Sequence, residues 1–382
     1  AGLYGESNAF LERAKKAGHE LWTEIVAEHI QAAVTTDNAL SYPGEDFERV
    51  LLHFVAALNY IGLGKYDSAR VEARQITNRL ELYNQTYSNE HKNAYKDDAF
   101  ARWLSGKLAE TEGGFQALND AWIDYRKSIE VYEEQYQSRY GTPLPEFVVQ
   151  DALRVTHALG HEFSSEFQEL RSRYPHVDFI KERDRQGMGE LVFIHLGGEA
   201  PYKVDNYWTA HTPTGPMRIA FPRFIKKRTA GKRARIEFSE NDSIETELAE
   251  DIAGIAVQNL KDHTGRIRAK AIARAIGKQV AAEVGQVVGK GLRKAGNEKV
   301  GSALEIGSVL FKVGSAVVEE ADKRSWVTLP ARIGVTSFFA EPGEYSLEVD
   351  FIDSGGDVVE SAEISTTLQQ NRTTFVFYRT FR

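Results

Sequence analysis

Two histidines on one face of a predicted helix come closest to a metal-binding pair in this sequence. His157 and His161 are four residues apart, and Glu162 follows directly. A zinc site needs three or four ligands, and the zincin spacing is absent. Gly160 also weakens the helix between the two histidines. The pattern therefore favours a structural role, and we predict no metal site.

Other residue types that could carry catalysis lack partners. His195 and His263 have no identifiable serine or aspartate partner in the sequence, so no triad is assigned. Cysteine is absent, which excludes thiolate nucleophiles, disulfides and Cys-ligated metal centres. The pairs Gly197-Gly198 and Gly231-Lys232 lack the full Walker spacing and are typical of strand turns. We predict a protein that is not an enzyme and that binds no cofactor.

Positive charge is concentrated in two stretches of a chain with a formal net charge of −8. Residues 218–235 contain eight Lys/Arg and no acid, and residues 261–299 contain ten Lys/Arg against three acids. The net charge argues against nucleic acid as a partner, and the run at 224–228 matches no nucleic-acid-reading module. We expect this run to form a basic loop that meets an acidic protein partner.

A helical array is predicted for the N-terminal half. Apolar and small residues recur at helical spacing over residues 47–83, with a glycine turn between two helices. The positions typical of a tetratricopeptide repeat are Ala57, Tyr60, Gly64, Tyr66, Ala69 and Ala73. A second unit spans residues 97–136, with a long turn expected at 112–118. An ordinary antiparallel helix pair is the alternative.

Further helices should flank these units, because such arrays need about three repeats to bury a continuous core. We expect them at residues 21–34 and 145–173. Residues 2–14 have the pattern of a turn followed by the second helix of a repeat. This pattern predicts that upstream residues are missing from the chain.

Period-two alternation starts at Gly189 and predicts strands. The predicted strands span residues 191–196, 217–221, 234–238, 333–339, 345–352, 358–365 and 373–378. Turns at 342–343 and 354–356 separate three of them at hairpin-like intervals, which favours a β-sandwich of about seven strands.

A long helical insertion is predicted between the two groups of strands. Residues 245–322 contain no proline and ten glycines, and residues 267–288 are basic and amphipathic. The insertion either folds back on its own sheet, or associates with a protein partner or a second copy, or meets an anionic lipid surface. Its predicted basic face comprises Arg266, Arg268, Lys270, Arg274 and Lys278.

These elements predict an α+β multidomain protein. The first domain is a tetratricopeptide-like helical array at residues 1–187. The second is a β-sandwich-like domain at 188–244 and 323–382. The Gly/Ala-rich helical insertion occupies residues 245–322 within it.

Several strings occur in an order that carries a family resemblance. The most specific are YPGEDFERVLLH, near the start, and ADKRSWVTLPA, after the insertion. Together with GELVFIHLGGEAPYKV, they resemble an uncharacterised bacterial family of tetratricopeptide-containing proteins, many of them predicted envelope lipoproteins. The resemblance implies a periplasmic or outer-membrane location and transfers no catalytic residues. Members typically begin with a lipoprotein signal and an extra helical segment, which this chain lacks.

The sequence predicts a non-enzymatic, envelope-associated scaffold that holds a protein partner on the concave surface of its array. The candidate contact residues are Tyr60, Tyr66, Arg70, Arg74, Trp103 and Trp122. The alternative is a self-assembling or membrane-interacting protein that acts through the insertion, and a third class is a glycan binder that uses exposed tryptophans such as Trp208. The segment from Asp322 to Pro330 is expected to form a turn fixed by a hydrogen bond between Asp322 and Arg324.

Overall fold

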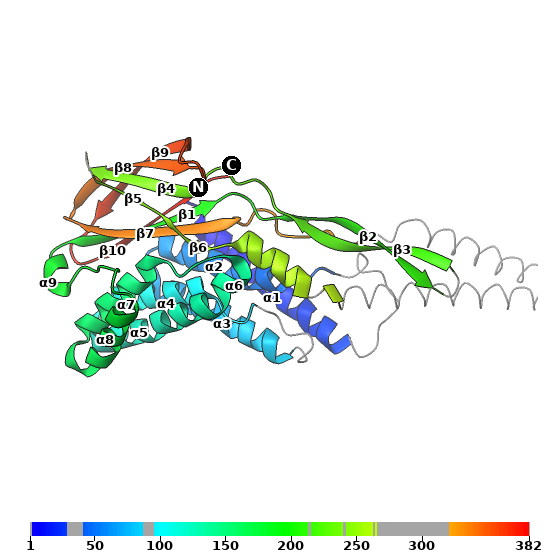
Figure 1. Ribbon diagram of the computed structural model, residues 1–382, viewed down its shortest axis with the longest axis horizontal. Helices are drawn as coiled ribbons and strands as arrows, with labels where there is room; N and C mark the ends of the chain where they lie inside the picture. Colours follow the sequence, from blue (N-terminus) through cyan, green and yellow to red (C-terminus); the bar gives the residue numbers. More distant parts are fainter. Residues whose placement is uncertain are drawn as a thin grey trace, which may run out of the picture.

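Helices in the N-terminal half and three sheets in the C-terminal part make this an α+β protein (Figure 1). The computed structural model describes residues 2–28, 41–86, 95–212, 215–239, 242–262, 264–265 and 321–381. Within these residues, the helices lie on one side of a four-stranded sheet, and a second four-stranded sheet lies on its other side.

The helices follow one another along the chain. They are α1 (Tyr4–Glu28), α2 (Asp46–Gly62), α3 (Tyr66–Thr86), α4 (Ala99–Glu112), α5 (Gly114–Val131), a π-helical turn (Tyr132–Tyr136), α6 (Gln137–Tyr140), α7 (Glu146–Ala158), a 3-10 turn (Gly160–Phe163), α8 (Ser164–Arg173) and α9 (Glu182–Arg185). The π-helical turn and α6 continue α5 without a break. The predicted helix at 145–173 is therefore two helices that a turn at Gly160 separates. The predicted N-terminal half-repeat and the first flank are one continuous helix, α1, as far as Glu28.

Local sequence chemistry explains where the array's helices begin and how closely they pack. Asp98 caps α4, because its Oδ1 accepts a hydrogen bond from the Ala101 N–H at 2.7 Å. A Cβ atom at Gly106 in α4 would lie 2.8 Å from the ring of Tyr125 in α5. Only a glycine therefore permits this approach of the two helices.

The expected long turn at 112–118 is wrong. Helix α4 ends at Glu112 and α5 begins at Gly114, so one residue, Gly113, joins them. Gly113 and Gly114 both have positive φ values, 71° and 81°, which are easily reached only by glycine. The two glycines allow the chain to reverse direction over fewer residues than the predicted turn at 112–118.

The strands form two four-stranded sheets and one two-stranded hairpin. The strand orders are β10-β1-β7-β6, β5-β4-β8-β9 and β2-β3. The strands are β1 (Gly189–Gly197), β2 (Tyr202–Thr212), β3 (Gly215–Ile225), β4 (Arg233–Ser239), β5 (Asp242–Glu245), β6 (Glu247–Glu250), β7 (Arg332–Ala340), β8 (Gly343–Ile352), β9 (Val358–Leu368) and β10 (Thr373–Arg379). All seven predicted strands are confirmed, and β2, β5 and β6 were not predicted.

Strand β1 is the buried centre of the fold. It pairs in parallel with β10 and antiparallel with β7. Its side chains alternate between two hydrophobic clusters, since Val192 and Ile194 pack with the helices, whereas Leu191 and Phe193 pack with the second sheet. Burial of both faces explains why this strand is a nearly continuous apolar run in the sequence.

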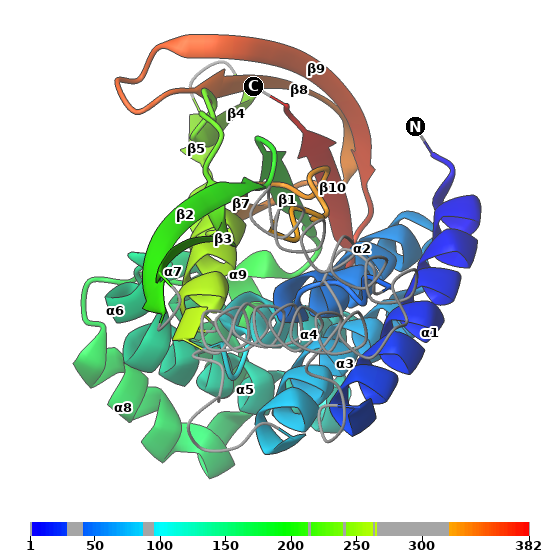
Figure 2. The ribbon, with the colours of Figure 1, turned by 90° about the vertical axis from the view of Figure 1, so that its right-hand side faces the viewer.

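The helical array and the first sheet share a single hydrophobic cluster. It contains Phe54 and Trp103 from the helices together with Val192, Ile333 and Val335 from the sheet. A second, smaller cluster lies between the two four-stranded sheets. Figure 2 shows the resulting order of layers, with the helices at the bottom, the sheet of β1 above them and the curved pair β8–β9 at the top.

The β2–β3 hairpin extends away from this layered body (Figure 1). It forms a sheet of its own, and its strands pair from Tyr202 with Ile225 to Thr212 with Gly215. Lys203 anchors its base to the array through an ion pair with Glu45, which precedes α2.

The expected start of the helical insertion at residue 245 is wrong. Residues 242–250 form β5 and β6, and a helix follows at 252–262. Most of the predicted insertion, including its whole basic face, lies outside the described residues. No helix in the described part of the chain has the length and apolar character needed to cross a membrane.

Candidate functional site

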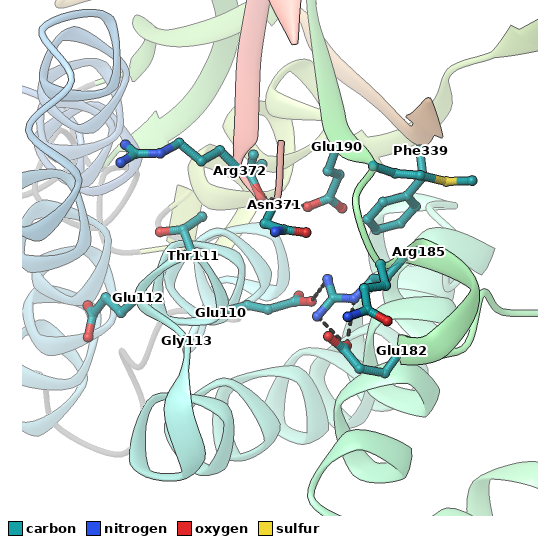
Figure 3. A pocket seen from close by; sticks show the side chains of 13 residues that line it. Glu110, Thr111, Glu112, Gly113, Glu182, Arg185, Glu190, Phe339, Asn371 and Arg372 are labelled. Atoms are coloured by element: carbon teal, nitrogen blue, oxygen red, sulfur yellow. Dashed lines mark hydrogen bonds and ion pairs between the residues drawn. The ribbon is translucent and has the colours of Figure 1, made fainter. Parts of the chain in front are cut away.

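A pocket of about 400 Å³ lies where the helical array meets the sheet (Figure 3). The end of α4, helix α9, the start of β1 and the loop between β9 and β10 enclose it. The side chains that give it its charge come from different elements. They are Glu110, Glu112, Glu182, Arg185, Glu190 and Arg372.

A buried ionic network lies behind this pocket, and Lys107 is at its centre. The lysine side chain is fully buried, and its Nζ lies 2.6 Å from Glu190, 3.0 Å from Asp151 and 3.5 Å from Glu110. Arg154 donates two hydrogen bonds of 2.8 Å to the carboxylate of Glu110. The network therefore joins α4 and α7 of the array to strand β1 of the sheet.

Three cations, Lys107, Arg154 and Arg185, face the buried carboxylates of Glu110, Asp151 and Glu190, and Arg185 also pairs with Glu182 at 2.6 Å. Burial alone raises the pKa of Glu110, but Arg154 and Lys107 outweigh it and hold this pKa below its ordinary value. Burial lowers the pKa of Lys107, but the three carboxylates raise it overall. Glu110 and Lys107 are thus held in their charged forms near neutral pH.

The mouth of the pocket is shaped by the turn between β9 and β10. Asn371 has a φ of 55°, a left-handed conformation that asparagine tolerates better than most residues. Its Oδ1 accepts a hydrogen bond of 3.0 Å from the Gly187 N–H, which ties this turn to the segment before β1. Figure 3 shows Arg372 pointing away from Arg185, so the two guanidinium groups lie on different sides of the pocket.

A second depression, which we name the outer groove, lies between α3, α4 and α5. It consists of two adjoining cavities of about 470 and about 150 Å³ that share Thr77 and Arg102. Helices α3 and α5 are farther from the sheet of β1 than α4 in both views (Figures 1 and 2). The side chains of Arg74, Asn78 and Lys96, which line the outer groove, are exposed to solvent.

The outer groove has cations at its rim and an ion-pair cluster at its centre. Arg102 lies 3.0 Å from Asp97 and 3.9 Å from Asp124. Arg74 and Lys96 are exposed at the rim, and Arg74 is 3.5 Å from Asp120. Glu81, Asp97 and Asp124 also line the outer groove, and the exposed Arg74 and Lys96 are the cations that an acidic segment can reach.

The predicted contact residues of the array lie in different environments. Trp103 and Trp122 lie in the core, and the Trp103 Nε1–H donates a hydrogen bond of 2.8 Å to Asp151. Tyr60 is half-buried against the same core. The structure thus buries both tryptophans, whereas Tyr60 keeps part of its side chain exposed.

Tyr66 faces the protein's own sheet. Its hydroxyl donates a hydrogen bond of 3.3 Å to the Thr373 carbonyl oxygen of β10, and its ring meets Phe375 edge-on. The face of the array that Tyr66 marks is therefore filled by the sheet. Arg70 pairs with Glu112 at 2.9 Å and with Asp120 at 2.7 Å, so of the predicted set only Arg74 lines the outer groove.

Other residues singled out in the sequence have clear positions. His157 packs against the rings of Phe167 and Phe179, and no cluster of three metal-ligating side chains exists among the described residues. The predicted hydrogen bonds between Asp322 and Arg324 are confirmed, the shortest being 2.7 Å. Trp208 is exposed on the β2–β3 hairpin.

Five predicted residues lie outside the described part of the chain, as does His263. They are Arg266, Arg268, Lys270, Arg274 and Lys278. Sequence reasoning missed the ionic network around Lys107. Its one visible signal is a lysine that follows Trp103 and Leu104 on the apolar side of a predicted helix, where a charge requires buried partners.

No family model, no curated protein and no solved structure matches the chain. The resemblance to an envelope family therefore stays a prediction.

Proposed function

We propose that this protein is a non-enzymatic scaffold that binds an acidic segment of a protein partner in the outer groove. The open, cation-rimmed groove between α3, α4 and α5 is the observation that carries the proposal. The envelope location rests on the family resemblance alone.

The finer architecture is part of this proposal. The successive helix pairs α2–α3, α4–α5 and α7–α8, with the close approach of Gly106 to Tyr125, support a tetratricopeptide-like array. The hydrophobic cluster between the two four-stranded sheets supports a β-sandwich.

The enclosed pocket supports a structural role over an enzymatic one. Glu110 and Glu190 are ion-paired, and the pKa of Glu110 is held below its ordinary value, whereas a general acid or base needs a pKa near the working pH. The pocket's network also connects three separate elements, as expected for a joint that holds the array on the sheet.

The proposal is tested by photo-crosslinking from the groove. A photoreactive residue at exposed Asn78 should give a discrete protein adduct in cells, whereas the same residue at exposed Glu169 of α8 should not. Arg74→Glu should abolish the adduct because it reverses a rim charge. Arg183→Glu, which reverses an exposed charge on α9, is the matched control.

Two results would contradict the proposal. One is the same set of adducts from positions 78 and 169, which would indicate random collisions. The other is an adduct at position 78 that persists in the Arg74→Glu variant. The alternative function through the Gly/Ala-rich insertion stays a prediction, because its basic face lies outside the described residues.

A further inference from the structure

Strand β9 forms a long open edge of the second sheet. The strand order β5-β4-β8-β9 places it at the end of this sheet, where it pairs with β8 alone. A bulge at Val359 interrupts the ladder at its start, and regular pairing runs from Glu360 to Leu368. Among the residues that the structure describes, no bond between backbone groups joins the far side of β9 to another segment. A row of N–H and C=O groups is therefore available to a further strand.

The carbonyl of Thr367 shows which residues of β9 face the open side. It accepts a hydrogen bond of 3.3 Å from the Thr374 hydroxyl of β10, so it points away from β8. Backbone directions alternate along a strand, and the N–H and C=O groups of Ser361, Glu363 and Ser365 therefore point the same way. The side chains of these three residues are exposed. The open edge is thus centred on Glu363.

Three glutamates lie side by side across the outer face of the second sheet, and we name them the acidic row. Glu237 of β4 is directly opposite Glu348 of β8, and Glu348 is directly opposite Glu363 of β9. In the described part of the chain, no cationic group lies within 4 Å of the three carboxylates, because both arginines of β4 pair with Glu245 instead, at 3.0 Å each. Like charges directly opposite one another destabilise a sheet.

An added strand would continue the acidic row beyond Glu363. Neighbouring strands lie about 4.8 Å apart, so the residue opposite Glu363 would hold its side chain beside this carboxylate on the outer face. A lysine or arginine at that position relieves the repulsion within the row, whereas an aspartate or glutamate adds a fourth negative charge. The edge therefore favours a basic segment.

A second copy of the chain fits this edge poorly. Glu363 is the central residue of β9, which runs from Val358 to Leu368. Two copies of β9 that pair antiparallel along their full length would therefore place Glu363 opposite Glu363. The strand also contains no lysine or proline, the residues that commonly protect open edges from foreign strands. Its charge thus disfavours self-pairing, and the edge stays open to a basic partner.

We propose that the open edge of β9 binds an extended, basic segment of a protein partner as an additional antiparallel strand. Backbone hydrogen bonds to Ser361, Glu363 and Ser365 supply affinity, and the acidic row selects a lysine or arginine opposite Glu363. The second sheet and the helices lie on opposite sides of the sheet of β1 (Figure 2). This edge is therefore separate from the outer groove, and the inference does not depend on the scaffold function.

The experiment uses the full chain and the labelled peptide TVKVKVKVT, with binding followed by fluorescence anisotropy. In an antiparallel pairing its lysines lie opposite Ser361, Glu363 and Ser365, and its central valines lie beside Ala362 and Ile364 on the inner face. N-methylation of the lysine amides, which point at β9, should weaken binding about tenfold or more. N-methylation of the valine amides, which point away, should leave binding nearly unchanged. The two methylated peptides carry the same charge.

Variants of the protein test the same contact from the other side. Glu363→Lys should weaken peptide binding about tenfold, because it reverses the charge at the centre of the edge. Glu169→Lys, which reverses an exposed charge on α8, is the matched control and should bind as the unchanged protein does. Ser365→Pro removes an outward N–H group and should also weaken binding, whereas Ser365→Ala should not. Thermal unfolding checks that each variant is folded.

Three results would overturn the proposal. The first is no binding of TVKVKVKVT at concentrations up to about 1 mM. The second is equal binding of the two methylated peptides, which would indicate that the peptide adsorbs through its charge alone. The third is sedimentation of the unchanged protein as a dimer that Ser365→Pro dissociates, because a second copy would then occupy the edge.

Discussion

Lys107→Met is the sharpest test of how the array is joined to the sheet. Methionine keeps most of the length of the side chain and removes its charge. The lysine is fully buried, and Nζ lies between 2.6 and 3.5 Å from the carboxylates of Glu190, Asp151 and Glu110. In the variant these three carboxylates face Arg154 and Arg185 alone, so one buried negative charge is uncompensated.

Breaking a buried ion pair by removing one partner costs about 3–5 kcal/mol, and we expect this loss in the free energy of unfolding of Lys107→Met. Urea unfolding followed by circular dichroism measures it. Lys127→Met is the matched control, because Lys127 also pairs with a glutamate, at 2.7 Å, but is 45% exposed. An exposed pair contributes only about 0.2–1 kcal/mol.

Lowering the pH should reduce the difference in the free energy of unfolding between Lys107→Met and the unchanged protein. The cations around Glu110 hold its pKa below the unfolded value, so its stabilising contribution is present above the unfolded pKa and is lost as pH falls through the folded one. In the variant, protonation removes the uncompensated buried negative charge, so the folded state becomes more stable as the pH falls. Adding Glu190→Gln should restore about 0.5–3 kcal/mol, since it removes the excess charge.

An equal decrease in the free energy of unfolding for Lys107→Met and Lys127→Met would refute this reasoning. The same conclusion would follow if Glu190→Gln lowered stability further in the Lys107→Met background. Either result would mean that the network is hydrated or that its charges are not coupled.

Three further predictions concern single contacts, each measured by urea unfolding. Gly106→Val should cost about 1–3 kcal/mol, because its side chain would overlap the ring of Tyr125, and an unchanged midpoint would contradict this packing. Burial raises the pKa of Asp98 to about 6, so its contribution to stability is present below the unfolded pKa and is lost as pH rises through about 6. Asp98→Asn should therefore make the free energy of unfolding less dependent on pH. An unchanged pH dependence in this variant would disprove the assignment. Tyr66→Ala should cost about 2 kcal/mol or more through its lost contacts with β10, whereas Tyr66→Phe should lose only the hydrogen bond to Thr373.

The sequence predicts the strands that have strong local patterns. It does not predict the strands whose formation depends on contacts with residues far away in the sequence. Strand β1 is an unmistakable apolar run because both of its faces are buried. Strand β6 reads as the start of a helix, since residues 247–250 include two glutamates. In the structure, the Glu247 carboxylate accepts hydrogen bonds from the first backbone N–H groups of α7, and Glu250 accepts one from Tyr136.

The candidate sites show the same limit. Repeat-like spacing places Trp103 and Tyr66 correctly on helices, but spacing alone does not say which helix face meets a partner and which meets the chain's own sheet. The basic run at 218–235 was visible, whereas Arg332 comes near its Lys232 only because β7 pairs with β1. Long-range strand pairing is therefore the information that the sequence did not supply.

The position of β10 has a consequence for how the chain acquires its structure. Strand β1 lies between β7 and β10, so its neighbours follow it by more than a hundred residues along the chain. Contacts of such high sequence separation are slow to form. During synthesis the finished helices must keep an apolar face, including Tyr66, uncovered until Phe375 and Phe377 arrive. The protein is thus most exposed to aggregation just before β10 is complete.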